Sequence, residues 1–186
     1  MARLSCRDAL LLLGIAGICG GSGCSGKDPY RPGESLGAFH VTAKLVSTTC
    51  GKTPDPWAFD VHLRHEKTTL YWVQGDAPIS GLVDPAAHAV LKATATKTMR
   101  AEDPKNALAA CAMARADVLD LVLAPLVMPA KDLQPATSFK GSLTYHFTAT
   151  EGSDCEDQLA AAGGDFDALP CDVHYNLDGA RTGDAK

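Results

Sequence analysis

The chain has 186 residues, of which 17 are lysine or arginine and 22 are aspartate or glutamate, so its formal net charge is −5 at pH 7. This acidic balance argues against a nucleic-acid partner, because binding to nucleic acid needs a basic surface. It also argues against a polybasic patch for binding a membrane surface.

Residues 1–23 have the organisation of a secretory signal peptide. Arg3 and Arg7 give a positive start, residues 9–18 form an apolar stretch, and small residues lead into Cys24. The apolar stretch is too short to span a bilayer, which needs about 20 such residues. The sequence therefore predicts an exported protein.

The end of this signal resembles the lipobox of bacterial lipoprotein precursors. Ser22, Gly23 and Cys24 match the last three positions of that motif, whereas Gly21 stands where the family prefers Leu or another aliphatic residue. The resemblance implies that a diacylglyceryl group is attached to Cys24, that the signal is cut just before it, and that the lipid bilayer is a partner. In that family a residue other than Asp after the cysteine, here Ser25, implies the outer membrane.

Residues 24–36 are then the lipidated cysteine and a flexible tether, because this segment is rich in Gly, Pro and Ser and lacks apolar periodicity. Gly33–Gly37, at the end of the tether and the start of the domain, matches the G-x-S-x-G motif of α/β-hydrolases. That motif works on a strand-to-helix turn of a parallel sheet, and no such pattern follows, so we interpret the match as chance. Residues 37–186 are expected to form one domain.

Alternation of apolar and polar residues dominates this domain. A period of two is typical of antiparallel strands with one buried face. The predicted strands are 37–47, 57–65, 68–74, 88–98, 111–124, 138–149 and 171–177.

The segment 111–124 is ambiguous, since its alanine content suits a helix. We predict a strand because Leu119, Leu121 and Leu123 alternate. A short helix is expected over 156–164, with Asp154 as its N-cap. Seven or eight short strands indicate an all-β fold, either an antiparallel sandwich or a small barrel.

Four cysteines remain once Cys6 and Cys19 leave with the signal and Cys24 carries the lipid. An even number in an exported chain indicates structural disulfides, and four cysteines allow three connectivities. We predict Cys155–Cys171, which closes a local loop containing the short helix, and hence Cys50–Cys111.

Two groups of residues are candidates for ligand binding. Five aromatic residues are expected inside the domain, where they either fill the core or line an apolar pocket: Trp57, Phe59, Trp72, Phe139 and Tyr145. Four aspartates flank the predicted Cys155–Cys171 bridge and could supply oxygen ligands to calcium: Asp154, Asp157, Asp165 and Asp167. The EF-hand spacing is absent, so a solvated acidic loop is the main interpretation, and we expect no metal or other cofactor.

Four histidines fall on the polar faces of predicted strands: His40, His62, His146 and His174. We expect them to be surface residues, able to bind a transition metal only if the fold brings some of them together.

The expected function is that of a non-enzymatic binding, assembly or inhibitor module anchored at the outer membrane, with a protein or a small apolar ligand as its partner. An inhibitor would show a rigid protruding loop, for which 151–171 is the candidate. The alternative is a hydrolase acting on envelope or extracellular polymers, but the sequence offers no recognisable nucleophile, metal cluster or acid pair.

Overall fold

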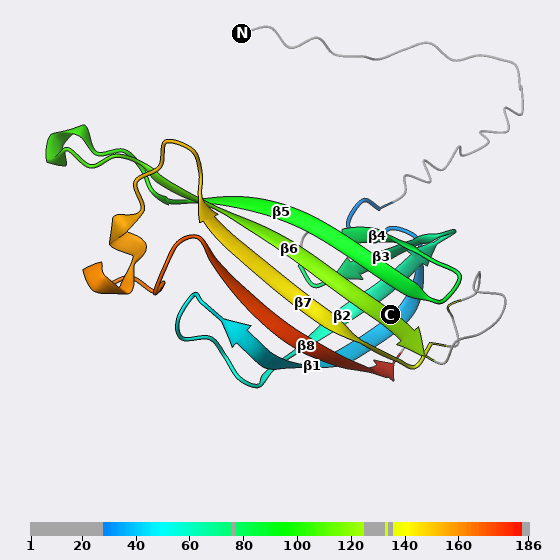
Figure 1. The fold of residues 1–186 in the computed structure, drawn as a ribbon. Helices are drawn as coiled ribbons and strands as arrows, with labels where there is room; N and C mark the ends of the chain where they lie inside the picture. Colours follow the sequence, from blue (N-terminus) through cyan, green and yellow to red (C-terminus); the bar gives the residue numbers. More distant parts are fainter. Residues whose placement is uncertain (1–27, 76, 125–132, 134–135, 184–186) are drawn as a thin grey trace, which may run out of the picture.

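The computed structural model describes residues 28–75, 77–124, 133 and 136–183. They form a closed antiparallel barrel in which eight strands follow one another in chain order and the last strand, β8, pairs with the first, β1. Figure 1 shows this barrel, with β5 and β6 running beyond their neighbours at one end. The predicted all-β fold is confirmed, and its form is the barrel. Within these residues no helix has the length and apolarity needed to cross a membrane.

The elements are β1 (Glu34–Thr48), β2 (Trp57–Glu66), β3 (Thr69–Val73), β4 (Ile79–Val83), β5 (His88–Arg100), η1 (Pro104–Asn106), β6 (Cys111–Ala124), β7 (Ser138–Ala149), η2 (Glu156–Gln158), η3 (Ala160–Ala162) and β8 (Cys171–Gly183). Each of the seven segments predicted as a strand forms one, including the ambiguous 111–124, which is β6. β4 was not predicted from the sequence. This strand has five residues, and Gly81 at its centre interrupts the alternating pattern.

The predicted helix over 156–164 is wrong in type. The chain forms two 3-10 turns, η2 and η3, because Leu159 between them is extended. Asp154 does act near the start, where its carboxylate accepts a hydrogen bond from the Glu156 N–H at 3.2 Å. Gly163 ends the second turn with a φ of 91°.

The two disulfides differ from the predicted pairs. Cys50 is bonded to Cys171, and Cys111 is bonded to Cys155. The predictions Cys50–Cys111 and Cys155–Cys171 are therefore wrong, and each cysteine of the 155–171 loop is fixed to a different part of the barrel.

Barrel closure explains the observed pairing. β8 runs antiparallel to β1 and places Val173 opposite Thr48, so Cys171 comes beside Cys50. The Asp154 N–H donates to the carbonyl of Ala110, which brings the next residue beside Cys111. Both contacts depend on strand order, whereas the prediction relied on closeness along the chain.

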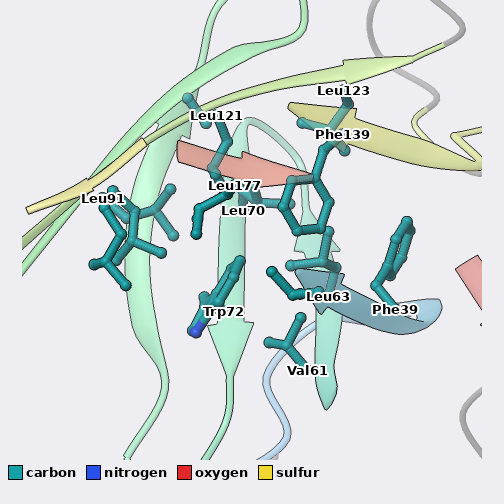
Figure 2. Packing of buried hydrophobic residues seen from close by; sticks show 14 of the residues in the cluster. Phe39, Val61, Leu63, Leu70, Trp72, Leu91, Leu121, Leu123, Phe139 and Leu177 are labelled. Atoms are coloured by element: carbon teal, nitrogen blue, oxygen red, sulfur yellow. The ribbon is translucent and has the colours of Figure 1, made fainter. Parts of the chain in front are cut away.

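The most closely packed part of the core lies in the half of the barrel that β3 and β4 cover, and buried residues continue from it to Val173 and Tyr175 on β8. Inward residues at alternate positions interlock there and are at most 1% exposed: Phe39, Val41, Val61, Leu63, Leu70, Leu91, Leu121 and Phe139. Figure 2 shows Trp72 among these side chains. The rings of Phe39 and Trp72 lie 5.6 and 5.7 Å from the ring of Phe139. Burial of each such side chain stabilises the fold by about 1.5–3 kcal/mol.

The N-terminal segment joins the barrel at this packed end. β1 begins at Glu34, so the strand takes up the last residues of the predicted tether. Arg64 fixes the segment before it, since its Nε donates to the carbonyl of Pro32 at 2.9 Å and its Nη2 donates to that of Gly33 at 2.6 Å. The predicted signal peptide and Cys24 lie outside the described residues.

Candidate functional site

The wall of the barrel is incomplete on one side. β3 and β4 have five residues each, whereas β2 has 10 and β5 has 13. Pairing of β2 with β3 starts at His62, and pairing of β4 with β5 ends at Leu91. Among the described strands, none lies beside residues 57–61 of β2 or 92–100 of β5 on this side. We call this opening the side window, and the end of the barrel where it lies, opposite the N-terminal segment, the open end.

Three adjoining cavities lie inside the open end, and Arg115 lines all three. We call them together the trough. The first, of about 400 Å³, lies at the side window, with walls that include Trp57, Trp72, Ile79, Leu119, Leu143 and Tyr145. The second, of about 320 Å³, includes Pro54, Phe166 and Tyr175, and the third, of about 340 Å³, includes Met99, Met113 and Phe147. These are volumes typical of small-molecule sites.

An ion pair stands at the centre of the trough. β6 places Arg115 and Asp117 on its inward face, two residues apart, where Nε donates to Oδ1 at 2.7 Å and Nη2 donates to Oδ2 at 2.8 Å. Asp117 is 5% exposed and is the charged residue most deeply buried in the described chain. The guanidinium carbon also lies 4.9 Å from the ring centroid of Tyr145, a cation–π contact.

This arrangement leaves hydrogen-bonding capacity facing the trough. A guanidinium has five N–H donors, and the bidentate contact with Asp117 uses two of them. The Arg115 side chain is 45% exposed, so its remaining donors are open to a ligand. Burial raises the pKa of Tyr145 to about 12, although the nearby charge of Arg115 opposes the shift. The Tyr145 hydroxyl therefore stays protonated at neutral pH.

The predicted aromatic candidates fall into two groups. Trp57, Trp72 and Tyr145 line the first cavity. Phe59 supports them from the same interior, with its ring centroid 4.3 Å from that of Trp57 and 6.0 Å from that of Trp72. Phe139 is fully buried in the core beyond Trp72 and does not line the trough.

The acidic candidates do not form a cluster. Asp157 is paired with Arg100, and Asp165 lines the second cavity. Asp167 lies against Gly51, and the Asp154 carboxylate accepts the hydrogen bond from the Glu156 N–H described above. In the described ranges no three potential metal-ligating side chains lie together. The calcium interpretation also assumed a Cys155–Cys171 bridge, which the fold does not form.

The candidate histidines lie on the outer face of the barrel. His40 and His146 form hydrogen bonds with Asp60 and Asp172 on neighbouring strands, at 2.8 and 2.7 Å. Although β1 and β8 are neighbours, His174 of β8 lies opposite Ser47 of β1, seven residues along the strand from His40. These two histidines are therefore far apart. His62 is exposed on β2.

The serine of the G-x-S-x-G match is part of β1. Ser35 Oγ accepts a hydrogen bond from the Gly37 N–H at 3.1 Å. It lies in a strand at the packed end of the barrel and does not sit on a strand-to-helix turn, the position that the hydrolase motif requires.

Arg115 and Asp117, at the centre of the trough, were not predicted as site residues from the sequence. A signal for them was present, because the alternation of Leu119, Leu121 and Leu123 continues backwards through 117 and 115 and places Asp117 and Arg115 inside. Because 111–124 was also considered as a helix, the inward orientation of positions 115 and 117 was not inferred.

Comparison of the chain with protein-family models, with curated proteins and with solved structures finds no match. The geometry of the open end is therefore the basis for assigning a function.

Proposed function

We propose that this chain is a non-enzymatic lipoprotein of the cell envelope, anchored at the outer membrane through acylated Cys24, whose barrel binds a small, partly apolar ligand in the trough. The observation that carries the proposal is the ion pair of Arg115 and Asp117 inside a cavity whose walls combine aromatic and aliphatic side chains with the amide of Gln74. Desolvation of such a pair is costly, and replacement by apolar residues is often neutral or stabilising. A role in binding explains why the pair is there.

The chemistry of the walls describes the ligand. Trp57, Trp72 and Tyr145 offer flat apolar surfaces, which suit an aromatic or alicyclic body. The free N–H groups of Arg115 suit an oxygen acceptor such as a carbonyl, hydroxyl or carboxylate. Asp117 balances the charge of Arg115, so the site accepts a neutral polar group as well as a weak acid.

The position of the trough fits attachment through the N-terminus. The N-terminal segment enters β1 at the packed end, while the trough, both disulfides and the hairpin between β5 and β6 lie at the open end. A lipid on Cys24 would hold the packed end near the bilayer, and the open end would face away from it. The trough would stay accessible to dissolved ligands.

Tryptophan fluorescence tests the binding site. The chain has two tryptophans, and both line the first cavity. The probe is 1-anilinonaphthalene-8-sulfonate, an aromatic acid, followed by a panel of aromatic and alicyclic carbonyl and carboxyl compounds. Binding is expected to quench both tryptophans and to transfer energy to the probe.

A matched pair of variants makes the test specific. Arg115→Met is expected to weaken binding about tenfold or more, the size of one lost charged hydrogen bond. Lys140→Met removes the same charge from the outer face, where the side chain is 80% exposed, and is expected to leave binding unchanged. Equal affinities in the two variants, or no response to any compound, would contradict the ligand proposal.

Intact mass spectrometry of the protein from the membranes of its producer tests the anchor. The expected chain starts at Cys24, carries a diacylglyceryl group and further acyl chains, and is lighter by the four hydrogens of two disulfides. A mature chain without lipid would contradict the proposed anchor and leave the ligand site to be judged on its own test.

A further inference from the structure

We propose that the free edge of β5, residues 92–98, pairs with an extended acidic segment of a partner polypeptide. This inference goes beyond the proposed function, because it uses the backbone edge of a strand and does not depend on a ligand in the trough. Its evidence is the pairing register, the exposure of the strand and the charge along it.

The register shows which backbone groups are unpaired. The carbonyl of His88 accepts a hydrogen bond from the Asp84 N–H, and the carbonyl of Val90 points toward Gly81 of β4. Even-numbered residues of β5 therefore direct their backbone groups away from β6. Beyond Leu91, no described strand or loop bonds to this side. The edge consists of the N–H and C=O groups of Lys92, Thr94, Thr96 and Thr98.

This stretch is open on both faces as well as at its edge. All residues from 94 to 99 are exposed, including Ala95, Lys97 and Met99, which face the trough. Threonines at alternate positions favour the extended conformation. An edge of this length is a template for addition of another strand, and proteins normally cover or shorten such edges. In β-augmentation the main-chain hydrogen bonds give affinity, and pockets for alternate side chains give specificity.

The open end also holds the edge in place. Cys111, at the start of β6, is bonded to Cys155 of the loop before β8. At the end of β5, the Arg100 guanidinium donates to the carbonyls of Ala109 and Asp154 and pairs with Asp157. A partner strand would thus meet an edge that is already ordered, which lowers the entropy lost on binding.

Charge indicates the chemistry of the partner. The whole chain is acidic, yet the segment 88–101 has Lys92, Lys97 and Arg100 and no acidic residue. Arg100 is paired with Asp157, whereas no ion pair within the described residues includes Lys92 or Lys97. Like charges on adjacent strands are destabilising and opposite charges are stabilising. The edge therefore favours an acidic strand and disfavours β5 of a second copy.

Amide NMR of the full-length mature protein in mild detergent tests the inference. The probes are two end-blocked peptides about six residues long, the usual length of a strand, with alternating Val and Glu or alternating Val and Lys. The acidic peptide is expected to shift and protect the amides of Lys92, Thr94, Thr96 and Thr98. The basic peptide is expected to bind at least tenfold more weakly.

Two substitutions of Thr96 test whether peptide binding depends on the backbone N–H at the edge of β5. Thr96→Pro removes an N–H that makes no bond to β6, and an edge strand tolerates such a change. It is expected to abolish binding of the acidic peptide, while Thr96→Val keeps the N–H and the affinity. Should Thr96→Pro not fold, the double variant Lys92→Glu/Lys97→Glu serves instead, and it is expected to reverse the preference between the two peptides.

Three results would overturn the inference. The first is no response of the edge amides to the acidic peptide at millimolar concentration. The second is binding that persists in Thr96→Pro. The third is protection of these amides that grows with protein concentration without peptide, which would assign the edge to a second copy. Tryptophan fluorescence with the aromatic probe is measured on the same variants, so loss of the trough site is recognised separately.

Discussion

The ion pair inside the barrel predicts that its two partners contribute unequally to stability. Asp117 is 5% exposed, while the side chain of Arg115 is 45% exposed. Arg115→Met leaves a buried carboxylate without its two N–H donors, and breaking a buried pair in this way costs about 3–5 kcal/mol. Asp117→Leu leaves a guanidinium that reaches water and still lies on Tyr145, so the expected cost is about 1 kcal/mol.

The double variant Arg115→Met/Asp117→Leu separates charge from packing. Apolar residues of similar volume commonly replace a buried pair without loss, so this variant is expected within about 1 kcal/mol of the natural protein, or above it. The two single costs would then not add, as expected for residues in direct contact.

Urea unfolding followed by tryptophan fluorescence, with both disulfides intact, measures these differences. With a slope of about 2 kcal/mol per molar urea, the midpoint for Arg115→Met is expected to fall by about 2 M and that for Asp117→Leu by about 0.5 M. Equal shifts for the single variants would refute the assignment of Asp117 as the buried partner. A double variant as unstable as the sum of the two would refute the charge argument.

Two further predictions concern the disulfides and Tyr145. Non-reducing peptide mapping is expected to recover Cys50 linked to Cys171 and Cys111 linked to Cys155, and a fragment joining Cys155 to Cys171 would contradict the barrel closure. Because the first pair is separated by 121 residues and the second by 44, replacing each by serines is expected to lower the free energy of unfolding by about 5 and about 4 kcal/mol in the chain-entropy estimate, measured in urea. Burial raises the pKa of Tyr145 from its ordinary value of 10 to about 12, so the stability from its neutral hydroxyl is complete below pH 10 and is lost as the pH rises through 12. Ultraviolet titration is expected to show a late-ionising tyrosine that Tyr145→Phe removes, and an unchanged titration in that variant would count against its burial.

The strands could be predicted from the sequence where apolar residues alternate clearly and mark an inward face. Phe39, Val41 and Leu63 illustrate this, since they are at most 1% exposed and occupy the alternate positions that the sequence marks as apolar. β4 could not be predicted in this way because it is short and has a glycine at its centre. Gly81 leaves room for the carbonyl of Val90 on β5, and no local pattern encodes such a constraint from a neighbouring strand.

The candidate site was less predictable because it depends on strand order. Trp57 and Tyr145 were expected inside, but they line one cavity only because barrel closure brings β2 and β7 to the same interior. The correct disulfides required knowing that β8 returns to β1. The short lengths of β3 and β4, which create the side window, gain their meaning only beside the longer β2 and β5.

Arg64 limits the length of the linker between the barrel and the proposed lipid. It fixes the carbonyls of Pro32 and Gly33, and just before them the Asp28 carbonyl accepts a hydrogen bond from the Arg31 N–H at 3.1 Å. The reach to a lipid on Cys24 would therefore be shorter than the roughly 25 Å of seven fully extended residues. Strands of up to 15 residues give the barrel a height of about 35 Å at a typical tilt. In the proposed arrangement the open end is the far end, so it would reach molecules some tens of ångströms off the membrane, beyond the lipid headgroups.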